Sequence, residues 1–215
     1  MDTLQAIRTR RSVRDFNREP VSTDMLYQVI AAAGFAPSAM NEQPWHFTIV
    51  NDTEILNGLS KRAKAWMVKN VSNMPRSNHF RDILNDPDFD IFYGAPVLVL
   101  ISAPTEDHWA AEDCSVAAQN LMLMATSLGL GSCWIGFSQD WLNTPDGREF
   151  LGLSQQSLVV APIVLGHPKA PPPPVARKAP AITWVGQKPA HPPVEKTRPQ
   201  TSRPHPIVLN PLRRP

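Results

Sequence analysis

The spacing of apolar residues along the chain predicts several amphipathic helices. The clearest follows Ser22, where apolar residues recur every three or four positions as far as Gly34, which is the spacing of one helix face. Ser22 is a suitable N-cap, Asp24 lies where the helix dipole favours an anion, and Gly34 can end the helix. Similar patterns predict helices at residues 3–9, 52–69 and 109–128, and a short one that begins at Thr144-Pro145.

The segment 109–128 is apolar on more than one side of the expected helix. Its face is rich in alanine and methionine, with apolar residues at Ala110, Cys114, Ala117, Leu121, Met124 and Leu128. A helix with this pattern is buried, either in the core of the chain or in a subunit interface.

Four shorter apolar segments predict the strands of a sheet. Residues 95–102 form a nearly continuous apolar run, typical of a central strand buried on both faces. The other strands are expected at 46–50, 132–138 and 157–165. Residues 71–89 are polar and contain the breakers Pro75 and Pro87, so we expect a mobile excursion there, placed near an active site.

The composition changes sharply after His167. Residues 168–215 hold 14 of the 23 prolines and show no helical or strand period. They carry nine basic residues against one acidic residue, whereas residues 1–167 carry 12 basic and 18 acidic residues, so the net charge of +2 conceals an acidic body and a basic tail. We expect the compact domain to span 1–186, with 181–185 as a short strand or interface segment, and 187–215 to form a proline-rich basic tail. That tail either docks on a partner subunit or stays disordered.

The composition also limits the class of protein. No apolar run approaches the roughly 20 residues that span a bilayer, and the N-terminus lacks the apolar core of a signal peptide. A cytoplasmic protein is therefore expected. Cys114 and Cys133 lack metal-ligand spacing, and two buried thiols are favoured over a disulfide.

The candidate chemistry starts at Arg10-Arg11-Ser12-Val13-Arg14, which places three guanidinium groups and a hydroxyl in five residues. The planar fork of arginine suits bidentate capture of phosphate oxygens. In an extended segment Arg10, Ser12 and Arg14 share one face and can close around one phosphate. The alternative is a solvated basic turn.

Three separated blocks carry a resemblance to the FMN-dependent nitroreductase family over roughly residues 3–180. The first is Arg11-Ser12-Val13-Arg14-Asp15-Phe16, the second is Ala36-Pro37-Ser38 continuing to Asn41-Glu42-Gln43-Pro44-Trp45, and the third is Gly129–Gly136. The resemblance implies an α+β fold with a central, mostly antiparallel sheet flanked by helices. It also implies a homodimer with two FMN sites at the subunit interface, built from both chains.

The resemblance also implies which residues bind FMN. The phosphate pocket would be Arg10, Arg11, Ser12 and Arg14, joined by Arg177 from the far end of the domain. Asn41 and Gln43 would contact the ring or ribitol, and the backbone at Ile135, Gly136 and Phe137 would face the reactive ring nitrogen. Alternatives stay open: Arg177 as a solvated charge, Asn41 as an Asx-turn residue, and Gly136 as a strand glycine at a bulge.

The sequence shows no nucleophilic triad, zinc motif or glycine-rich phosphate loop, so we assign no catalytic side chain and no metal. His46 is expected to be a packed histidine. The expected function is an oxidoreductase in which NADH or NADPH reduces FMN, which then reduces a nitroaromatic, quinone or similar acceptor by a ping-pong mechanism. The alternatives are a flavin enzyme of the same fold, acting in reductive dehalogenation or flavin destruction, and a non-catalytic flavin- or polyanion-binding protein. Neither nucleic acid nor a membrane is expected as a partner.

Overall fold

The computed structural model describes residues 1–70, 83–104 and 109–186. Contacts divide the chain into two units, Met1–Pro172 and Pro173–Pro215. Most of the excursion expected at 71–89, and the whole tail 187–215, lie outside the described residues. The predicted domain boundary at Gly186 falls inside the second unit, and the assignment of 173–186 to the FMN-binding domain stays a prediction.

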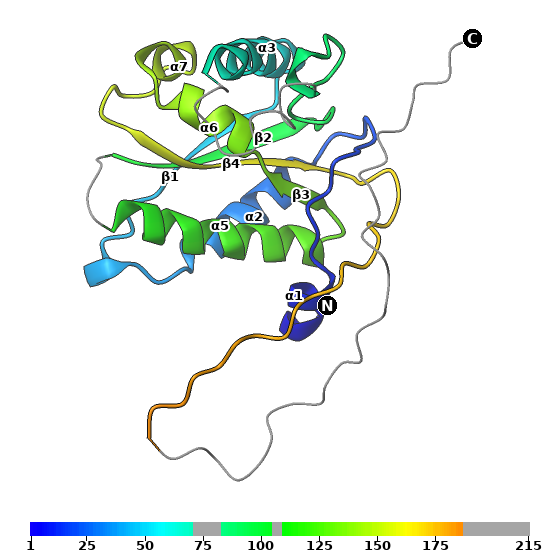
Figure 1. The fold of residues 1–215 in the computed structure, drawn as a ribbon, viewed down its shortest axis with the longest axis vertical. Coiled ribbons are helices and arrows are strands. Elements are labelled where there is room, and N and C mark those ends of the chain that lie inside the picture. Colours follow the sequence, from blue (N-terminus) through cyan, green and yellow to red (C-terminus); the bar gives the residue numbers. More distant parts are fainter. Residues whose placement is uncertain (71–82, 105–108, 187–215) are drawn as a thin grey trace. The chain divides into compact units, whose positions relative to one another are not determined.

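The first unit is built on one four-stranded sheet (Figure 1). Its strands are β1 (His46–Val50), β2 (Val97–Ala103), β3 (Gly131–Trp134) and β4 (Leu158–Gly166). Their order is β1-β2-β4-β3, and every neighbouring pair is antiparallel. The predicted antiparallel sheet is therefore confirmed, with the apolar strand β2 in its interior as expected.

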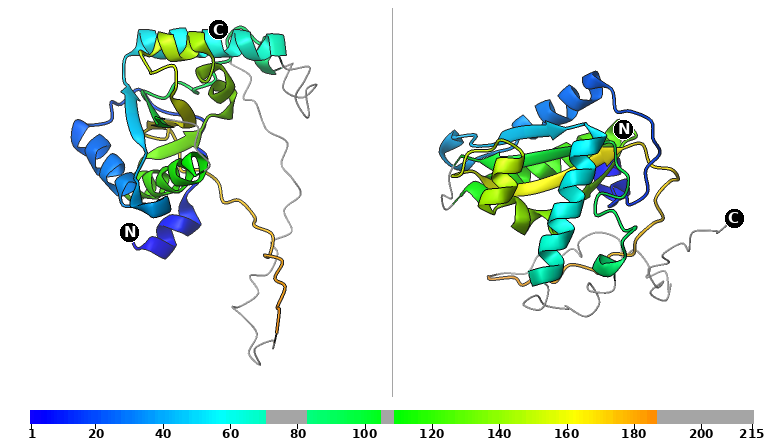
Figure 2. Two further views of the ribbon diagram at one scale, coloured as in Figure 1. Left: turned by 90° about the vertical axis from the view of Figure 1, so that its left-hand side faces the viewer. Right: turned by 90° about the horizontal axis from the view of Figure 1, so that it is seen from above.

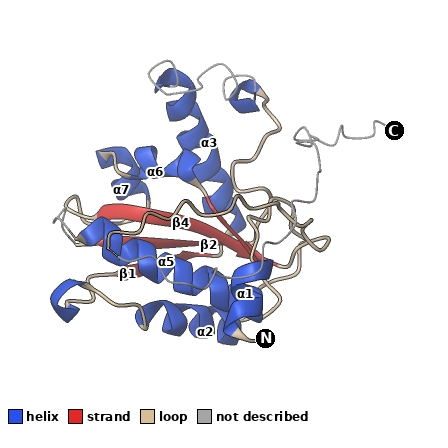
Figure 3. Ribbon diagram, turned by 60° about the horizontal axis from the view of Figure 1, so that its bottom comes forward, coloured by secondary structure: helices blue, strands red, loops and turns tan. Residues whose placement is uncertain are grey.

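Helices cover both faces of this sheet, as Figures 1 and 2 show. On one face lie α2 (Thr23–Gly34) and α5 (Ala110–Ser127), and on the other lie α3 (Thr53–Asn70), α6 (Gly136–Leu142) and α7 (Pro145–Phe150). The short helix α1 (Thr3–Thr9) contacts α5, and Figure 3 shows it near the end of α2. This arrangement confirms the predicted α+β class.

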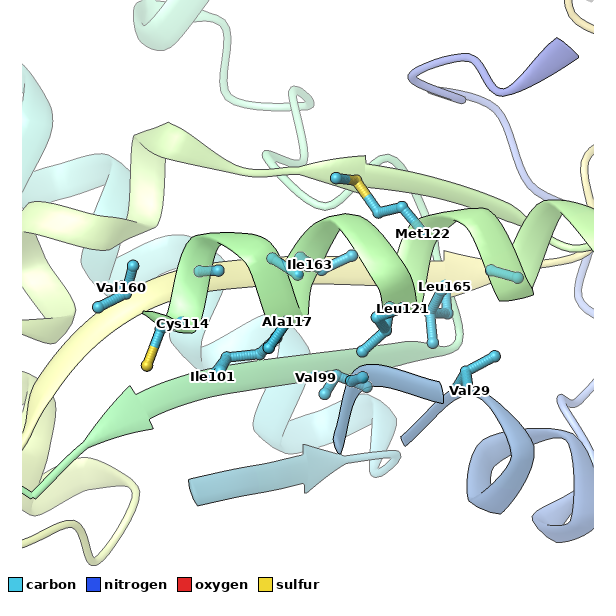
Figure 4. Close-up of a cluster of buried hydrophobic side chains, with 14 of the residues drawn as sticks. Val29, Val99, Ile101, Cys114, Ala117, Leu121, Met122, Val160, Ile163 and Leu165 are labelled. Carbon is cyan, nitrogen blue, oxygen red and sulfur yellow. The ribbon is translucent and has the colours of Figure 1, made fainter. Parts of the chain in front are cut away.

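The alternation of side chains in β2 produces two separate cores. Val97, Val99 and Ile101 pack with α2 and α5, while Leu98 and Leu100 pack with α3 and α6. Figure 4 shows small and medium side chains of α5 against those of the sheet. Small residues let the helix approach the strands closely, and this explains why the alanine-rich pattern of α5 belongs in the core.

The helix ends follow the predicted capping chemistry. Ser22 Oγ accepts a hydrogen bond from the Met25 amide at 3.3 Å, and Thr144 Oγ1 accepts one from the Gly147 amide at 3.1 Å, with Pro145 in the first helical turn. Cys114 and Cys133 are both buried and unbridged, which confirms the expectation of two buried thiols. No helix in the described ranges is long and apolar enough to cross a bilayer.

Two expected strands differ in the structure. The strand predicted at 132–138 ends at Trp134, and α6 begins at Gly136. The Ile135 amide still donates to the Pro162 carbonyl at 2.8 Å, but the Ile135 carbonyl accepts from the Ser138 amide, so the chain turns into a helix. Residues 181–185 form no strand, and their role at an interface stays a prediction.

Gly131 lies where the N-terminal segment packs on β3, so a substitution at this position tests how close that packing is. A Cβ at this position would lie 2.8–2.9 Å from three side-chain carbons of Val13. We therefore expect Gly131→Ala to lower the free energy of unfolding by about 1–3 kcal/mol, as overpacking does, in a denaturant titration. Gly34→Ala is the control, because its Cβ would meet no atom within 4 Å. Equal midpoints for both variants would show that the Val13 packing is loose.

Candidate phosphate and flavin site

The segment Arg10–Arg14, called the arginine segment below, lies extended along the edge of the sheet beside β3. Ser12 forms a parallel bridge with Ser132, and the Val13 amide donates to the Ser132 carbonyl at 3.0 Å. Val13 and Phe16 are buried and belong to the core on the α3 side, whereas Ser12 and Arg14 are exposed. Two apolar anchors therefore hold the segment in place while its polar side chains remain available.

Arg10, Ser12 and Arg14 gather around the buried Cys133 thiol of β3. Burial raises the pKa of Cys133, and this rise is opposed by the charge of Arg14, a hydrogen bond from Ser12 and the charge of Arg10. Three of the five predicted phosphate ligands, Arg10, Ser12 and Arg14, thus lie near the same thiol. Arg14 also lies over the ring of Tyr93, with its Cζ 6.0 Å from the ring centroid.

Arg11 has a different local role from its neighbours. Its Nη1 donates to the carbonyls of Arg8 and Arg10, each at 2.8 Å, and so satisfies the end of α1. Its Nε is buried and has no partner among the described residues. An anionic oxygen would satisfy this Nε donor. The phosphate contact of Arg11 is therefore compatible with its role at the end of α1, and it stays a prediction.

The second sequence block forms a strained loop around the short 3₁₀ turn η1 (Ala39–Asn41). Met40, Asn41 and Gln43 have positive φ angles of 50°, 59° and 51°, a conformation that non-glycine residues adopt at a cost of about 1–3 kcal/mol each and that clusters at functional sites. The loop is closed by Ser38 Oγ, which accepts from the Gln43 amide at 2.9 Å.

The side chains of Asn41 and Gln43 are paired within this loop. Gln43 Nε2 donates to Asn41 Oδ1 at 3.0 Å. The Asx-turn interpretation of Asn41 is wrong, because the Gln43 amide that such a turn needs bonds to Ser38 instead. Both side chains are exposed, so a ligand can reach them.

Asp113 joins the loop to α5. Its Oδ1 accepts from the Ala39 amide at 3.0 Å, and its side chain is buried in the first turn of the helix. Between the loop and this turn lies an open hollow of about 470 Å³, lined by Pro37, Ser38, Ala39, Met40, Trp109, Glu112, Asp113 and Val116.

The loop and the arginine segment lie at opposite ends of α5 within one chain (Figure 1). Asp113, in the first turn of α5, anchors the loop. Gly131, just after the end of α5, begins β3, which is the strand that the arginine segment pairs with. At 1.5 Å per residue, the helix between these points is roughly 20 Å long. The structure therefore brings Arg10, Ser12 and Arg14 together and places Asn41 and Gln43 elsewhere.

The third block contributes backbone groups at the start of α6. The Ile135 amide is already bonded to the Pro162 carbonyl at 2.8 Å, so this N–H is not available to a ligand. Gly136 is exposed, and a Cβ on it would meet no atom within 4 Å. The interpretation of Gly136 as a strand glycine is wrong, since it begins a helix whose first amides have no partner within the helix.

Arg177 and His46 complete the set of residues that the sequence singled out. Arg177 belongs to the second unit, and its contact with a phosphate stays a prediction. His46 lies exposed on β1, with Nδ1 3.5 Å from Thr48 Oγ1, so the expectation of a packed histidine is wrong. No group of three or more His, Cys, Asp or Glu residues in the described part of the chain is placed to hold a metal ion. Sequence reasoning missed Tyr93 and Asp113, which join the site only through contacts distant in the chain.

The contact of Asp113 with the loop can be tested by measuring the free energy of unfolding of variants at this position. Asp113→Ala removes the acceptor of the Ala39 amide and should lower the free energy of unfolding by about 1–3 kcal/mol, measured by denaturant titration. Asp113→Asn retains an acceptor oxygen and should keep most of this stability. Glu112→Ala, at the exposed neighbouring position, is the control. An alanine variant as stable as the control would contradict the anchoring role.

Comparison with known proteins identifies the relatives of this chain. The family model of the Nitroreductase family matches residues 7–167. A protein of Archaeoglobus fulgidus named for NADH dehydrogenase and NAD(P)H nitroreductase is 32% identical over 168 residues, which cover 78% of this chain and 86% of that relative. Its name indicates an oxidoreductase.

Solved structures share the fold. A nitroreductase with bound FMN from Bacteroides fragilis is 33% identical and has a TM-score of 0.76, covering 86% of this chain and 99% of that one. An iodotyrosine deiodinase bound to FMN and 3-iodo-L-tyrosine has a TM-score of 0.70 over 86% of this chain and 99% of that one, but at 21% identity it shows the fold alone. The family match over most of the chain confirms the resemblance found in the sequence: the chain belongs to the nitroreductase family.

Proposed function

We propose that this protein is an FMN-dependent oxidoreductase that uses NADH or NADPH to reduce electron-poor acceptors such as nitroaromatics and quinones. The observation that carries the proposal is the arginine segment, held against β3 by Val13 and Phe16, with Ser12 and Arg14 exposed beside Arg10. Guanidinium and hydroxyl donors gathered in this way suit the oxygens of a phosphate. Both the FMN-bound relative and the NAD(P)H-named relative support the choice of cofactor and reductant.

The donor set of this chain fits FMN. Arg10, Ser12 and Arg14 would hold the phosphate, and Gly136 leaves room for a ring to approach the first amides of α6. Bound FMN supplies the hydride chemistry, and the protein binds it, orients it and sets its electrostatic surroundings. We assign no catalytic side chain, and the reductant and the acceptor would occupy the same slot in turn.

The protein would act as a homodimer. The loop that carries Asn41 and the arginine segment of the same chain lie at opposite ends of α5, with roughly 20 Å of helix between them, so a second copy would place such a loop beside the segment. Each of two sites would then combine Arg14 of one chain with Asn41 of its partner. Several apolar residues around the loop and the start of α5 are exposed in the single chain, which suits burial against a partner: Phe35, Met40, Trp109 and Val116. We propose cytoplasmic residence for this dimer.

The phosphate assignment predicts the effect of removing one arginine. Arg14→Ala should weaken FMN binding by about 1.5–3 kcal/mol, or roughly 10- to 150-fold, the range for a hydrogen bond to a charged group. Titration of the apoprotein followed by flavin fluorescence measures this change. Arg18→Ala is the matched control, because Arg18 is an exposed arginine four residues further along. Unchanged affinity in the Arg14 variant would remove the main support for the proposal.

The shared site predicts complementation between two defective chains. Arg14→Ala and Asn41→Ala homodimers should each bind FMN weakly. A mixed dimer has one site with both changes and one site with neither, so it should recover tight binding of one FMN per dimer. If both groups served a site within one chain, mixing would recover nothing.

The shared slot predicts ping-pong kinetics. With NAD(P)H varied at several fixed concentrations of a nitroaromatic acceptor, double-reciprocal plots should be parallel, because the first product leaves before the acceptor enters. Intersecting lines would require both substrates to be bound together and would contradict the slot. A yellow protein that NAD(P)H bleaches but no nitroaromatic reoxidises would favour the different flavin chemistry of other proteins with this fold.

A further inference from the structure

We propose that Tyr93 is a positioning residue that holds Arg14 in place for the FMN phosphate. The inference rests on the proposed function, since it assigns a second residue to the same phosphate site. Arg14 is exposed, and its Cζ lies 6.0 Å from the centre of the Tyr93 ring, within reach of a cation–π interaction. A long side chain that would otherwise sample many rotamers is thereby given a surface to lie on.

The Tyr93 ring is itself fixed by other aromatic side chains. It packs edge-on against Phe89, with centroids 5.8 Å apart, and Phe89 packs edge-on against Phe137 at 6.5 Å. Phe137 lies in the first turn of α6, beside Gly136. The aromatic row therefore runs from Arg14 at the phosphate end of the site to the helix start assigned to the flavin ring.

The backbone beneath Tyr93 is strained and braced. Tyr93 has a positive φ of 59° and Gly94 one of 69°. The Asp90 carboxylate accepts from the Phe92 amide at 3.0 Å and from the Gly94 amide at 2.8 Å, and Ser60 Oγ donates to it at 2.7 Å. A bulky residue in this conformation is uncommon and persists only where the surroundings enforce it. The position of the ring is thus determined by a network that is independent of Arg14.

The contact restrains Arg14 without cancelling its charge. Burial raises the pKa of Tyr93 above its usual value near 10. The Arg14 charge and a hydrogen bond from Arg14 oppose this rise, while the nearby Cys133 and Asp90 add to it, so the phenol is neutral at neutral pH. The neighbouring carboxylate, Asp15, is paired with Lys169 at 2.6 Å. In the described part of the chain Arg14 has no ion pair, so its charge remains for an anion.

The test compares FMN with riboflavin, which lacks the phosphate. Apoprotein is titrated with each flavin, and the ratio of the two dissociation constants isolates the phosphate contribution. Tyr93→Asn removes the ring while keeping a residue that tolerates positive φ. It should weaken FMN about fivefold, the scale of a cation–π contact, and leave riboflavin unchanged. Tyr93→Phe keeps the ring but removes the hydroxyl that Arg14 hydrogen-bonds, so it should weaken FMN less than Tyr93→Asn does and leave riboflavin unchanged.

Two controls decide between positioning and general damage. Tyr27→Asn changes an exposed tyrosine of α2 and should alter neither flavin. In an Arg14→Ala background, Tyr93→Asn should have no further effect on FMN, because the residue it positions is gone. Equal weakening of FMN and riboflavin, unchanged FMN affinity, or a full additional loss in the Arg14→Ala background would each overturn the inference. Equal affinity of the wild type for both flavins would instead refute the phosphate site itself.

Discussion

The close packing of α5 against the sheet is the constraint on which both halves of the candidate site depend. Cys114, Ala117, Ala118, Leu121 and Ala125 are fully buried, and the small side chains of the cysteine and the three alanines allow the helix to lie near the strands. Since a helix is a rod of fixed rise, this packing also fixes the distance between its ends. The loop bonded to its first turn and the strand that follows its last turn are therefore held apart.

Backbone strain marks the same two places. Within the described ranges, the non-glycine residues with positive φ are Met40, Asn41, Gln43 and Tyr93. Three lie in the loop at one end of α5, and the fourth lies beside Arg14 at the other. Each position is enforced by a carboxylate or hydroxyl that bonds to backbone amides: Asp113 and Ser38 for the loop, and Asp90 for Tyr93. Such strain costs stability and clusters at functional sites, so it supports the site assignment independently of the motifs.

The sequence predicted those parts of the fold that depend on local pattern. The apolar run of β2 and the apolar spacing along α2 and α5 identified these three elements, because the burial of a strand or of a helix face is visible in the order of neighbouring residues. The change from β3 to α6 was missed because the apolar pattern continues past Trp134, whereas the chain turns into a helix where the Ile135 carbonyl accepts from the Ser138 amide. The same limit applies to the site: the motifs indicated Arg14 and Asn41, but not that they lie apart, nor that Tyr93 and Asp113 support them.

A site divided between two chains links cofactor binding to assembly. If the phosphate grip belongs to one chain and the Asn41 loop to its partner, FMN has its full set of contacts only in the dimer. A ligand that binds one state stabilises it in proportion to RT ln(1 + [L]/Kd), so FMN would strengthen the dimer, and dilution would release FMN. Because the groups in both halves are held rigidly, they would lose little conformational entropy when FMN binds. The same rigidity would prevent them from adjusting to a misplaced partner chain, so FMN affinity would depend strongly on correct assembly. In the proposed dimer, the separation that α5 imposes would therefore make the flavin part of the interface between the two chains.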